Sequence, residues 1–300
     1  MNKRIIALGL VTIGLIGFGL IGLDLIGSST QAAPDRTGWP KELTFGVIPA
    51  EASQEISTRF KPLVDHLERK LGIKVKSYLG ADYAAVVVGM QSGTVDLAYL
   101  GPLSYVLAAR QSGAQAFARE NTLKTGAGYS GVIVSKANGG VKTLAEARGK
   151  NFAFVDPQSA SGYLLPMVYF AQELKLKPEA FFKNVKFGGS HEANIEAVIE
   201  GEIDVAATND REIEVAIRDG EIKSARDLNV LWRSQPIPTA PLAYRRELPA
   251  SLKAALRDAV LGFQDKKALE RIGLKGFMPA TDAEYEPIRK LEAIKKSLAQ

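Results

Sequence analysis

The sequence contains no cysteine, and this absence excludes disulfide-stapled domains, thiolate zinc sites, cysteine nucleophiles and a lipid-modified cysteine anchor. Only two histidines are present, His66 and His191, so a histidine-rich metal centre is excluded as well. The excess of one charge sign is small, because 38 basic and 33 acidic residues leave a net charge of +5 on 300 residues. No basic run occurs, so we expect no nucleic-acid partner, and the mild surplus suits small anions.

The first 32 residues have the pattern of a secretory signal peptide. Two basic residues precede an uncharged, apolar stretch over residues 5–23, and small residues follow it. We predict removal of residues 1–32, with cleavage after Thr30-Gln31-Ala32. The apolar stretch is long for a signal core, and an uncleaved single-helix membrane anchor is the alternative. In either case the remaining chain is expected to work outside the cytoplasm.

Strand-like and helix-like segments alternate after residue 40. Short β-rich runs are followed by stretches with apolar residues at helical spacing, and this order predicts an α/β fold with mainly parallel sheets. The expected strands are 43–48, 73–78, 95–99, 132–134, 152–155, 203–206 and 230–232. The expected helices include 56–71, 81–90, 252–263, 266–272 and 282–298.

The length of the chain predicts about two domains, yet no polar linker divides it. We therefore expect two lobes joined by crossing strands. One crossing is predicted at Pro236-Ile237-Pro238, because prolines favour extended backbone, and the other near residues 126–129. Lobe I would then comprise residues 33–127 and 239–300, and lobe II residues 128–238.

The loop Asp156-Pro157-Gln158-Ser159-Ala160-Ser161-Gly162 lies between a predicted strand and an apolar helical stretch. Backbone N–H groups and the positive end of the helix would form an anion cradle here, and the two serine hydroxyls add donors. No Gly-Lys-Ser/Thr ending follows, so the loop is not a nucleotide P-loop. The alternative is structural, in which Ser161 caps the helix and Asp156-Pro157 forms a turn.

A second glycine-containing loop, Gly188-Gly189-Ser190-His191-Glu192, opens another helix with a histidine at its mouth. His191 could donate to a bound oxyanion, whereas the structural alternative is that Ser190 caps the helix and the histidine is incidental. Two helix mouths of this kind favour an anion site.

Two tyrosines and the end of one strand add further candidates. Tyr83 opens a predicted helix and Tyr129 follows a glycine-rich segment, and each hydroxyl can donate to an anion. Each tyrosine taken alone is more often a half-buried core residue. Asn209 and Asp210 follow the end of a strand, where open α/β sheets place their ligands. No catalytic motif of a serine or metal hydrolase is present, so we expect no enzyme activity, no cofactor and no metal.

These segments together resemble the substrate-binding proteins of phosphonate and phosphite ABC importers, the periplasmic phosphonate-binding family. Besides the signal peptide, the matching segments are Phe45-Gly46-Val47-Ile48, Asp82-Tyr83-Ala84, residues 95–102, Gly128-Tyr129, residues 156–162 and Ser190-His191-Glu192-Ala193. The Asp-Pro-x-Ser-x-Ser-Gly and Ser-His-Glu segments, in this order, are quite specific to that family. The resemblance implies the type II binding-protein fold, in which two α/β lobes joined by two crossing hinge strands close on the ligand.

The resemblance also implies an oxyanion pocket formed by Tyr83, Tyr129, Ser159, the Ala160 N–H, Ser161 and His191. Members that bind aminoalkylphosphonates hold the ligand's ammonium with two acids, and the corresponding positions here are Arg211 and Ala240. Neither side chain can hold a cation, and a buried ammonium without its acids costs several kcal/mol. We therefore expect a ligand without an amine, phosphite first, then methylphosphonate or phosphate. Asp210 or Asn209 could instead touch the ligand, the acid accepting from a protonated oxygen.

The resulting prediction is a periplasmic, monomeric binding protein that captures a small phosphorus oxyanion by hinge closure. It would deliver this ligand to the permease of an ABC transporter in the inner membrane. A secreted phosphoester hydrolase and a ligand-binding sensor subunit are the alternatives.

Overall fold

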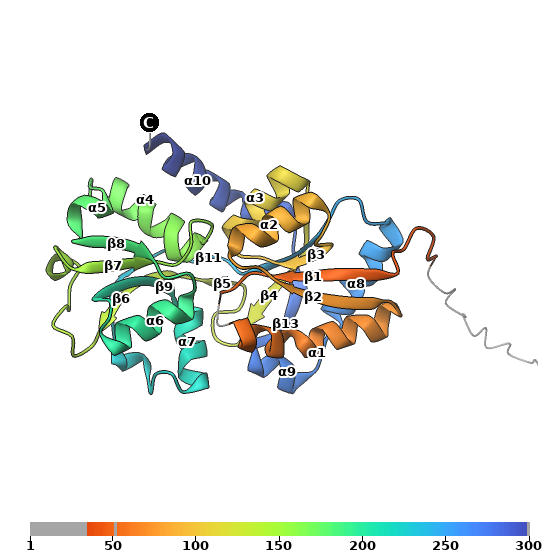
Figure 1. Cartoon of the computed structure of the whole chain (residues 1–300), viewed down its shortest axis with the longest axis horizontal. Helices are drawn as coiled ribbons and strands as arrows, with labels where there is room; N and C mark the ends of the chain where they lie inside the picture. Colours follow the sequence, from red (N-terminus) through yellow and green to blue (C-terminus); the bar gives the residue numbers. More distant parts are fainter. Residues whose placement is uncertain (1–34, 51–52, 299–300) are drawn as a thin grey trace, which may run out of the picture. The chain divides into compact units, whose positions relative to one another are not determined.

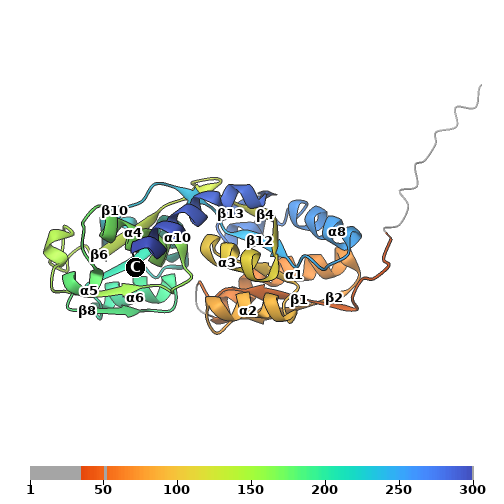
Figure 2. The same ribbon diagram turned by 90° about the horizontal axis from the view of Figure 1, so that it is seen from above.

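The computed structural model of the protein describes residues 35–50 and 53–298. These residues form two α/β lobes, and each lobe is built around one main sheet with helices packed on it (Figures 1 and 2). The predicted signal peptide, residues 1–32, lies outside the described residues. Within the part of the chain that is described, no helix is both long and apolar enough to cross a membrane.

Lobe I contains a six-stranded sheet in the order β13-β4-β12-β3-β1-β2. Its strands are β1 (Glu42–Val47), β2 (Lys74–Leu79), β3 (Leu97–Tyr99), β4 (Gln115–Thr122), β12 (Pro241–Tyr244) and β13 (Leu274–Pro279). The helices around it are α1 (Ser53–Leu71), α2 (Tyr83–Ser92), α3 (Pro102–Ser112), α8 (Ala250–Leu261) and α9 (Lys266–Arg271). Helices α2 and α3 cover one face, and α1, α8 and α9 cover the other (Figure 1).

Lobe II contains a five-stranded sheet in the order β10-β6-β9-β7-β8. Its strands are β6 (Gly131–Lys136), β7 (Asn151–Phe154), β8 (Asn184–Phe187), β9 (Val205–Asn209) and β10 (Leu228–Arg233). The helices are η1 (Ala145–Ala147), η2 (Ala160–Leu164), α4 (Leu165–Gln172), α5 (Pro178–Phe181), α6 (His191–Glu200), α7 (Asp210–Asp219) and η3 (Ala225–Asp227).

The central strand β6 shows why the sequence of lobe II has short, continuous apolar runs. Val132 and Val134 point into the apolar cluster under α6 and α7, whereas Ile133 points into the cluster on the opposite face. All three side chains are fully buried. A strand covered by helices on both faces needs apolar residues at every position, so alternation is lost.

The two lobes are joined where the sequence predicted crossings. Strand β5 (Gly128–Tyr129) pairs in antiparallel fashion with β11 (Ile237–Pro238), and the chain passes between the sheets along both. A third element also reaches both lobes. After η4 (Asp282–Tyr285), helix α10 (Glu286–Leu298) packs against α3 of lobe I and α4 of lobe II (Figures 1 and 2).

The predicted α/β class and the two crossings are confirmed, but the expectation of mainly parallel sheets is wrong. Strand β1 pairs in parallel with β2 and β3, and β7 pairs in parallel with β8 and β9. Strands β4, β12 and β13 of lobe I, and β6 and β10 of lobe II, are antiparallel to their neighbours. In lobe I the chain returns to the sheet after crossing, and β12 and β13 then run in the reverse direction. In lobe II the first strand after the crossing, β6, runs against its neighbours β9 and β10. Each sheet lies within one predicted lobe, while the exact lobe boundaries stay a prediction.

Candidate functional site

A cavity of about 40 Å3 is enclosed by residues of both lobes. Six of the eight predicted ligand residues line it, namely Tyr83, Tyr129, Ser159, Ala160, His191 and Asn209. The other lining residues are Ile48, Ala50, Tyr99, Gly101, Pro102, Glu120, Arg211, Glu212 and Ala240. Because a cavity needs only about 10–15 Å3 of this kind of volume to hold one water molecule, this cavity suits a ligand the size of a few water molecules.

The N-terminal ends of several helices meet at this cavity. Tyr83, Pro102 and His191 are the first residues of α2, α3 and α6, and each lines the cavity. Helix α7 contributes its capping residue, Asn209, and η2 contributes its first residue, Ala160. The N-terminal end of a helix carries partial positive charge and unpaired N–H groups. The helix ends therefore direct partial positive charge at the cavity, whose described lining includes Arg211, Glu120 and Glu212 but no lysine, and helix ends of this kind commonly bind oxyanions.

Capping side chains satisfy part of the backbone at three of these helix ends. Asp82, Ser190 and Asn209 each accept a hydrogen bond from the N–H group of the third helical residue. Helix α3 has no such side-chain bond, because its cap is Gly101, which itself lies in the cavity wall. Local sequence thus satisfies one N–H group at three of these helix ends, and the first N–H groups of α6 and α7 donate to Ala50 O and Ser130 O.

The Ser159 loop is held in shape by its own hydrogen bonds. The Asp156 carboxylate accepts from Gln158 N at 2.7 Å, and Ser159 Oγ accepts from Gly162 N at 3.0 Å. Gly162 is required by space, since a Cβ atom there would lie 2.3 Å from Val155 Cγ2. The expected turn at Asp156 is therefore present. The helix that follows is capped by Ser159, whereas the structural alternative had expected Ser161 to cap it. The turn and the cap together place Ser159 and Ala160 in the cavity wall.

Ser161 and Asp210 do not line the cavity. Ser161 is 1% exposed, accepts a hydrogen bond from Asn209 Nδ2 at 3.4 Å and is bonded to the Tyr129 side chain. It therefore holds two lining residues in place. Asp210 accepts from Ser130 N at 2.9 Å and pairs with Arg233 at 2.6 Å, at the side of the crossing strands.

His191 is buried and is oriented by polar neighbours. Its Nδ1 lies 3.1 Å from Thr208 Oγ1 and 3.2 Å from Asn209 Nδ2. Burial, followed by the positive charge of Arg211, lowers the pKa of His191 to about 3. The imidazole is therefore neutral at physiological pH. Asn209 Nδ2 can only donate, and it lies 3.2 Å from Nδ1 and 3.3 Å from Nε2, so the neutral ring uses one nitrogen as an acceptor and carries its proton on the other.

This neutral histidine makes stability depend on pH. Between about pH 3 and 6.5 the unfolded chain binds a proton at His191 that the folded chain does not bind. The free energy of unfolding should therefore rise with pH across this window and lose this dependence above it. Urea unfolding of the protein and of His191→Gln across the window measures the effect. We expect a flatter pH profile in the variant, and identical slopes would contradict the assignment.

The sequence argument missed two acids that line the cavity, Glu120 on β4 and Glu212 on α7. The guanidinium of Arg211 lies between them: Nη2 donates to Glu120 Oε1 at 3.0 Å and Nη1 donates to Glu212 Oε1. Glu120 also accepts from the Tyr99 hydroxyl at 2.8 Å. Burial raises the pKa of Glu212, and the charge of Arg211 opposes that rise. The resemblance placed Arg211 and Ala240 where members that bind aminoalkylphosphonates have two acids. Both residues line the cavity.

Two signals in the sequence pointed to these acids. Glu212 stands three residues after a capping asparagine, where a carboxylate commonly folds back on a helix start. Glu120 lies inside a strand, where a charged residue at a buried position needs a partner. Neither signal could show that Arg211 of α7 pairs both with its neighbour Glu212 and with Glu120 of the other lobe.

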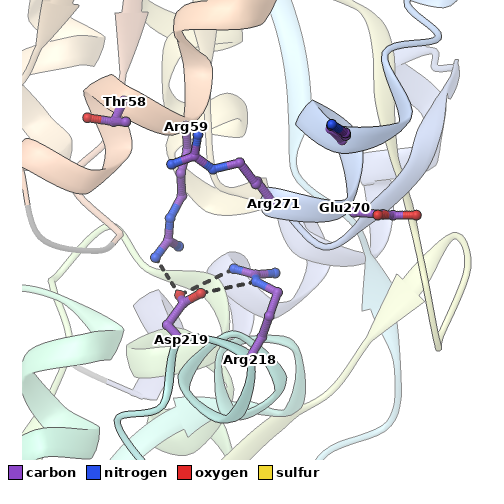
Figure 3. Close-up of a pocket in the computed structure, with 7 residues that line it drawn as sticks. Thr58, Arg59, Arg218, Asp219, Glu270 and Arg271 are labelled. Carbon is purple, nitrogen blue, oxygen red and sulfur yellow. Dashed lines mark hydrogen bonds and ion pairs between the residues drawn. The ribbon is translucent and has the colours of Figure 1, made fainter.

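A larger hollow of about 660 Å3 lies beside α1, α7 and α9 (Figure 3). Arg59 Nη2 of α1 pairs with Asp219 Oδ2 of α7 at 2.5 Å, and Arg218 pairs with the same carboxylate. Arg59 is buried, whereas Asp219 keeps about a quarter of its side-chain surface exposed. This ion pair joins lobe I to lobe II outside the cavity. A second link is the hydrogen bond from His191 N to Ala50 O at 3.0 Å.

Residues 45–285 match the family model described as "ABC transporter, phosphonate, periplasmic substrate-binding protein". The chain belongs to this family. Members of the phosphonate-binding family are substrate-binding components of transporters and not enzymes, so the expectation of no enzyme activity is confirmed. The type II binding-protein fold is confirmed too.

Three relatives of this chain show the extent of the similarity. The phosphonates-binding periplasmic protein of Escherichia coli is 30% identical over 85% of this chain and 77% of its own length. The phosphate-import protein PhnD of Mycolicibacterium smegmatis is 30% identical over 84% and 85%. The crystal structure of a binding protein component of an ABC phosphonate transporter from Pseudomonas aeruginosa has a TM-score of 0.80. It is 29% identical, covering 86% of this chain and 87% of that one.

Proposed function

We propose that this binding protein captures phosphite, with methylphosphonate or phosphate as the next ligands, and delivers it as a monomer to the permease of an ABC importer. The observation that carries the proposal is the small enclosed cavity onto which the N-terminal ends of α2, α3, α6 and α7 open. Relatives named for phosphonate and for phosphate support the ligand class.

In the proposed complex, hydroxyl, imidazole and backbone donors surround the oxyanion. Ser159 Oγ accepts from Gly162 N and keeps its own proton for a ligand oxygen. Burial raises the pKa of Tyr129 far above neutral, so its hydroxyl stays protonated. His191 donates through its ring N–H, Tyr83 through its hydroxyl, and Ala160 through its backbone N–H. Hydrogen bonds of this kind to an ionised acceptor are short and strong.

Ligand binding would close the two lobes about β5 and β11. Tyr83 belongs to lobe I, whereas Ser159, Ala160 and His191 belong to lobe II. A ligand held by both sets makes all its contacts only in the closed state, so it shifts the equilibrium toward closure. The Arg59–Asp219 ion pair and the His191–Ala50 hydrogen bond form across the lobes at the same time. The permease would recognise this closed form.

Calorimetric titration of the purified protein with phosphite, methylphosphonate, phosphate and 2-aminoethylphosphonate tests the proposal. We expect the tightest binding for phosphite and no binding for the aminophosphonate. Ser159→Ala and His191→Ala each remove one donor to the charged ligand, so each should weaken phosphite binding roughly tenfold to a hundredfold.

Ser224→Ala is the matched control, because Ser224 also caps a short helix but lies outside the cavity lining. Its affinity should equal that of the unmodified protein. If the protein binds none of the four ligands, the proposed function is overturned. If Ser159→Ala and His191→Ala both bind phosphite as tightly as the unmodified protein, the proposed ligand shell is overturned.

A further inference from the structure

We propose that Arg211 occupies the place of a ligand cation inside the cavity and thereby decides which phosphonates the protein accepts. This inference rests on the proposed function, since it concerns the same cavity. In this inference the Arg211 side chain pairs with the buried carboxylates that the ammonium group of an aminoalkylphosphonate would otherwise pair with.

The geometry shows a complete cation site whose occupant is the protein's own guanidinium. Arg211, Glu120 and Glu212 all line the cavity, and their side chains are 11%, 1% and 5% exposed. Arg211 bonds to one carboxylate of lobe I and to one of its own helix. It also donates to Ile272 O at 3.2 Å, which fixes the guanidinium against lobe I.

Charge explains why this arrangement rejects an aminoalkyl ligand. Two buried carboxylates need a cation beside them, because an uncompensated buried charge is strongly unfavourable. Arg211 meets that need in this structure, so an incoming ammonium finds both acids paired and a positive charge in front of them. Like charges at short distance in a desolvated cavity repel strongly.

Space reinforces the same selection. The cavity measures about 40 Å3, and its wall at Ala240 carries only a methyl side chain. Room for an aminoethyl group therefore has to come from the Arg211 side chain itself. A small neutral residue at position 211 would both enlarge the cavity and leave Glu120 and Glu212 to pair with a cation of the ligand.

The test compares Arg211→Ser and Arg211→Lys in calorimetric titrations with 2-aminoethylphosphonate and with ethylphosphonate, its analogue without the amine. We expect Arg211→Ser to gain binding of the aminophosphonate and to prefer it over ethylphosphonate by roughly tenfold or more. Arg211→Lys keeps the positive charge and should therefore gain no binding of the aminophosphonate. Adding Glu120→Gln to Arg211→Ser should remove much of the gain, because one of the two acids is lost.

Arg211→Gln provides a second variant in case Arg211→Ser does not fold, since its amide still donates to a carboxylate. It should shift preference toward the aminophosphonate in the same direction. Equal binding of both phosphonates by the folded variants would show that Arg211 only fills space, and this would overturn the inference. The inference would also fail if the unmodified protein bound 2-aminoethylphosphonate. If the unmodified protein binds phosphite but the variants gain no binding of 2-aminoethylphosphonate, this inference alone is overturned. If the unmodified protein binds none of the ligands, the proposed function is overturned.

Discussion

Replacing Gly162 with alanine is expected to destabilise the protein by roughly 1–3 kcal/mol and to weaken oxyanion binding about tenfold or more. The added Cβ atom would lie 2.3 Å from Val155 Cγ2 and 2.5 Å from Val155 Cβ, so the backbone of η2 has to move. It would also lie 3.0 Å from Ser159 Oγ, which both caps η2 and faces the cavity. Stability and binding should therefore fall together in thermal unfolding and calorimetric titration.

Gly128→Ala is a suitable control for this substitution. A Cβ atom at Gly128 would meet Ile237 O at 3.4 Å and Pro236 Cβ at 3.5 Å, which is ordinary van der Waals contact. We expect little change in unfolding for the control. An unchanged melting temperature and affinity in Gly162→Ala would show that the Ser159 loop can shift without cost, contrary to the packing described here.

Replacing Glu120 with alanine should produce the largest loss of stability, about 3–5 kcal/mol. The substitution leaves the buried Arg211 guanidinium with one carboxylate fewer and removes the acceptor of the Tyr99 hydroxyl at 2.8 Å. It also removes a contact between β4 of lobe I and α7 of lobe II. Urea unfolding measures the loss, and calorimetry should show weaker phosphite binding because closure is less favourable.

Glu120→Gln separates the lost charge from the lost hydrogen bonds. The amide oxygen can still accept from Tyr99 or Arg211, so its stability loss should be clearly smaller than that of Glu120→Ala. If both variants unfold like the unmodified protein, the Glu120–Arg211–Glu212 cluster does not support the fold in the way its burial indicates.

The sequence predicted those parts of the site that are encoded locally. Ser159 and His191 each stand in a glycine-containing loop before a helix, and this pattern alone indicates a helix mouth. Tyr83 follows a capping aspartate and opens α2 in the same way. Loops of this kind fold by hydrogen bonds between neighbouring residues, so their geometry can be inferred from their own sequence.

The parts that were not predicted depend on residues far apart in the chain. Arg211 meets Glu120 across 91 positions, and the pairing forms only when both lobes are assembled. The antiparallel strands were missed for a related reason, because strand direction depends on where the chain re-enters a sheet and not on the strand's composition. Asp210 shows the converse: it stands at a strand end that faces the ligand side, yet Arg233 and Ser130 N engage it.

The use of helix ends in place of lysines has a consequence for the conditions under which the protein works. Dissolved ions weaken the attraction between charges that are exposed to water, but they screen charges much less where most of the surrounding residues are buried, as around this cavity. The partial charges at the starts of α2, α3, α6 and α7 are fixed by the backbone and cannot titrate. A receptor of this construction holds its ligand with nearly the same strength in dilute and in saline surroundings. The nutrient concentration at which uptake begins would then stay constant while the salinity outside the cell changes.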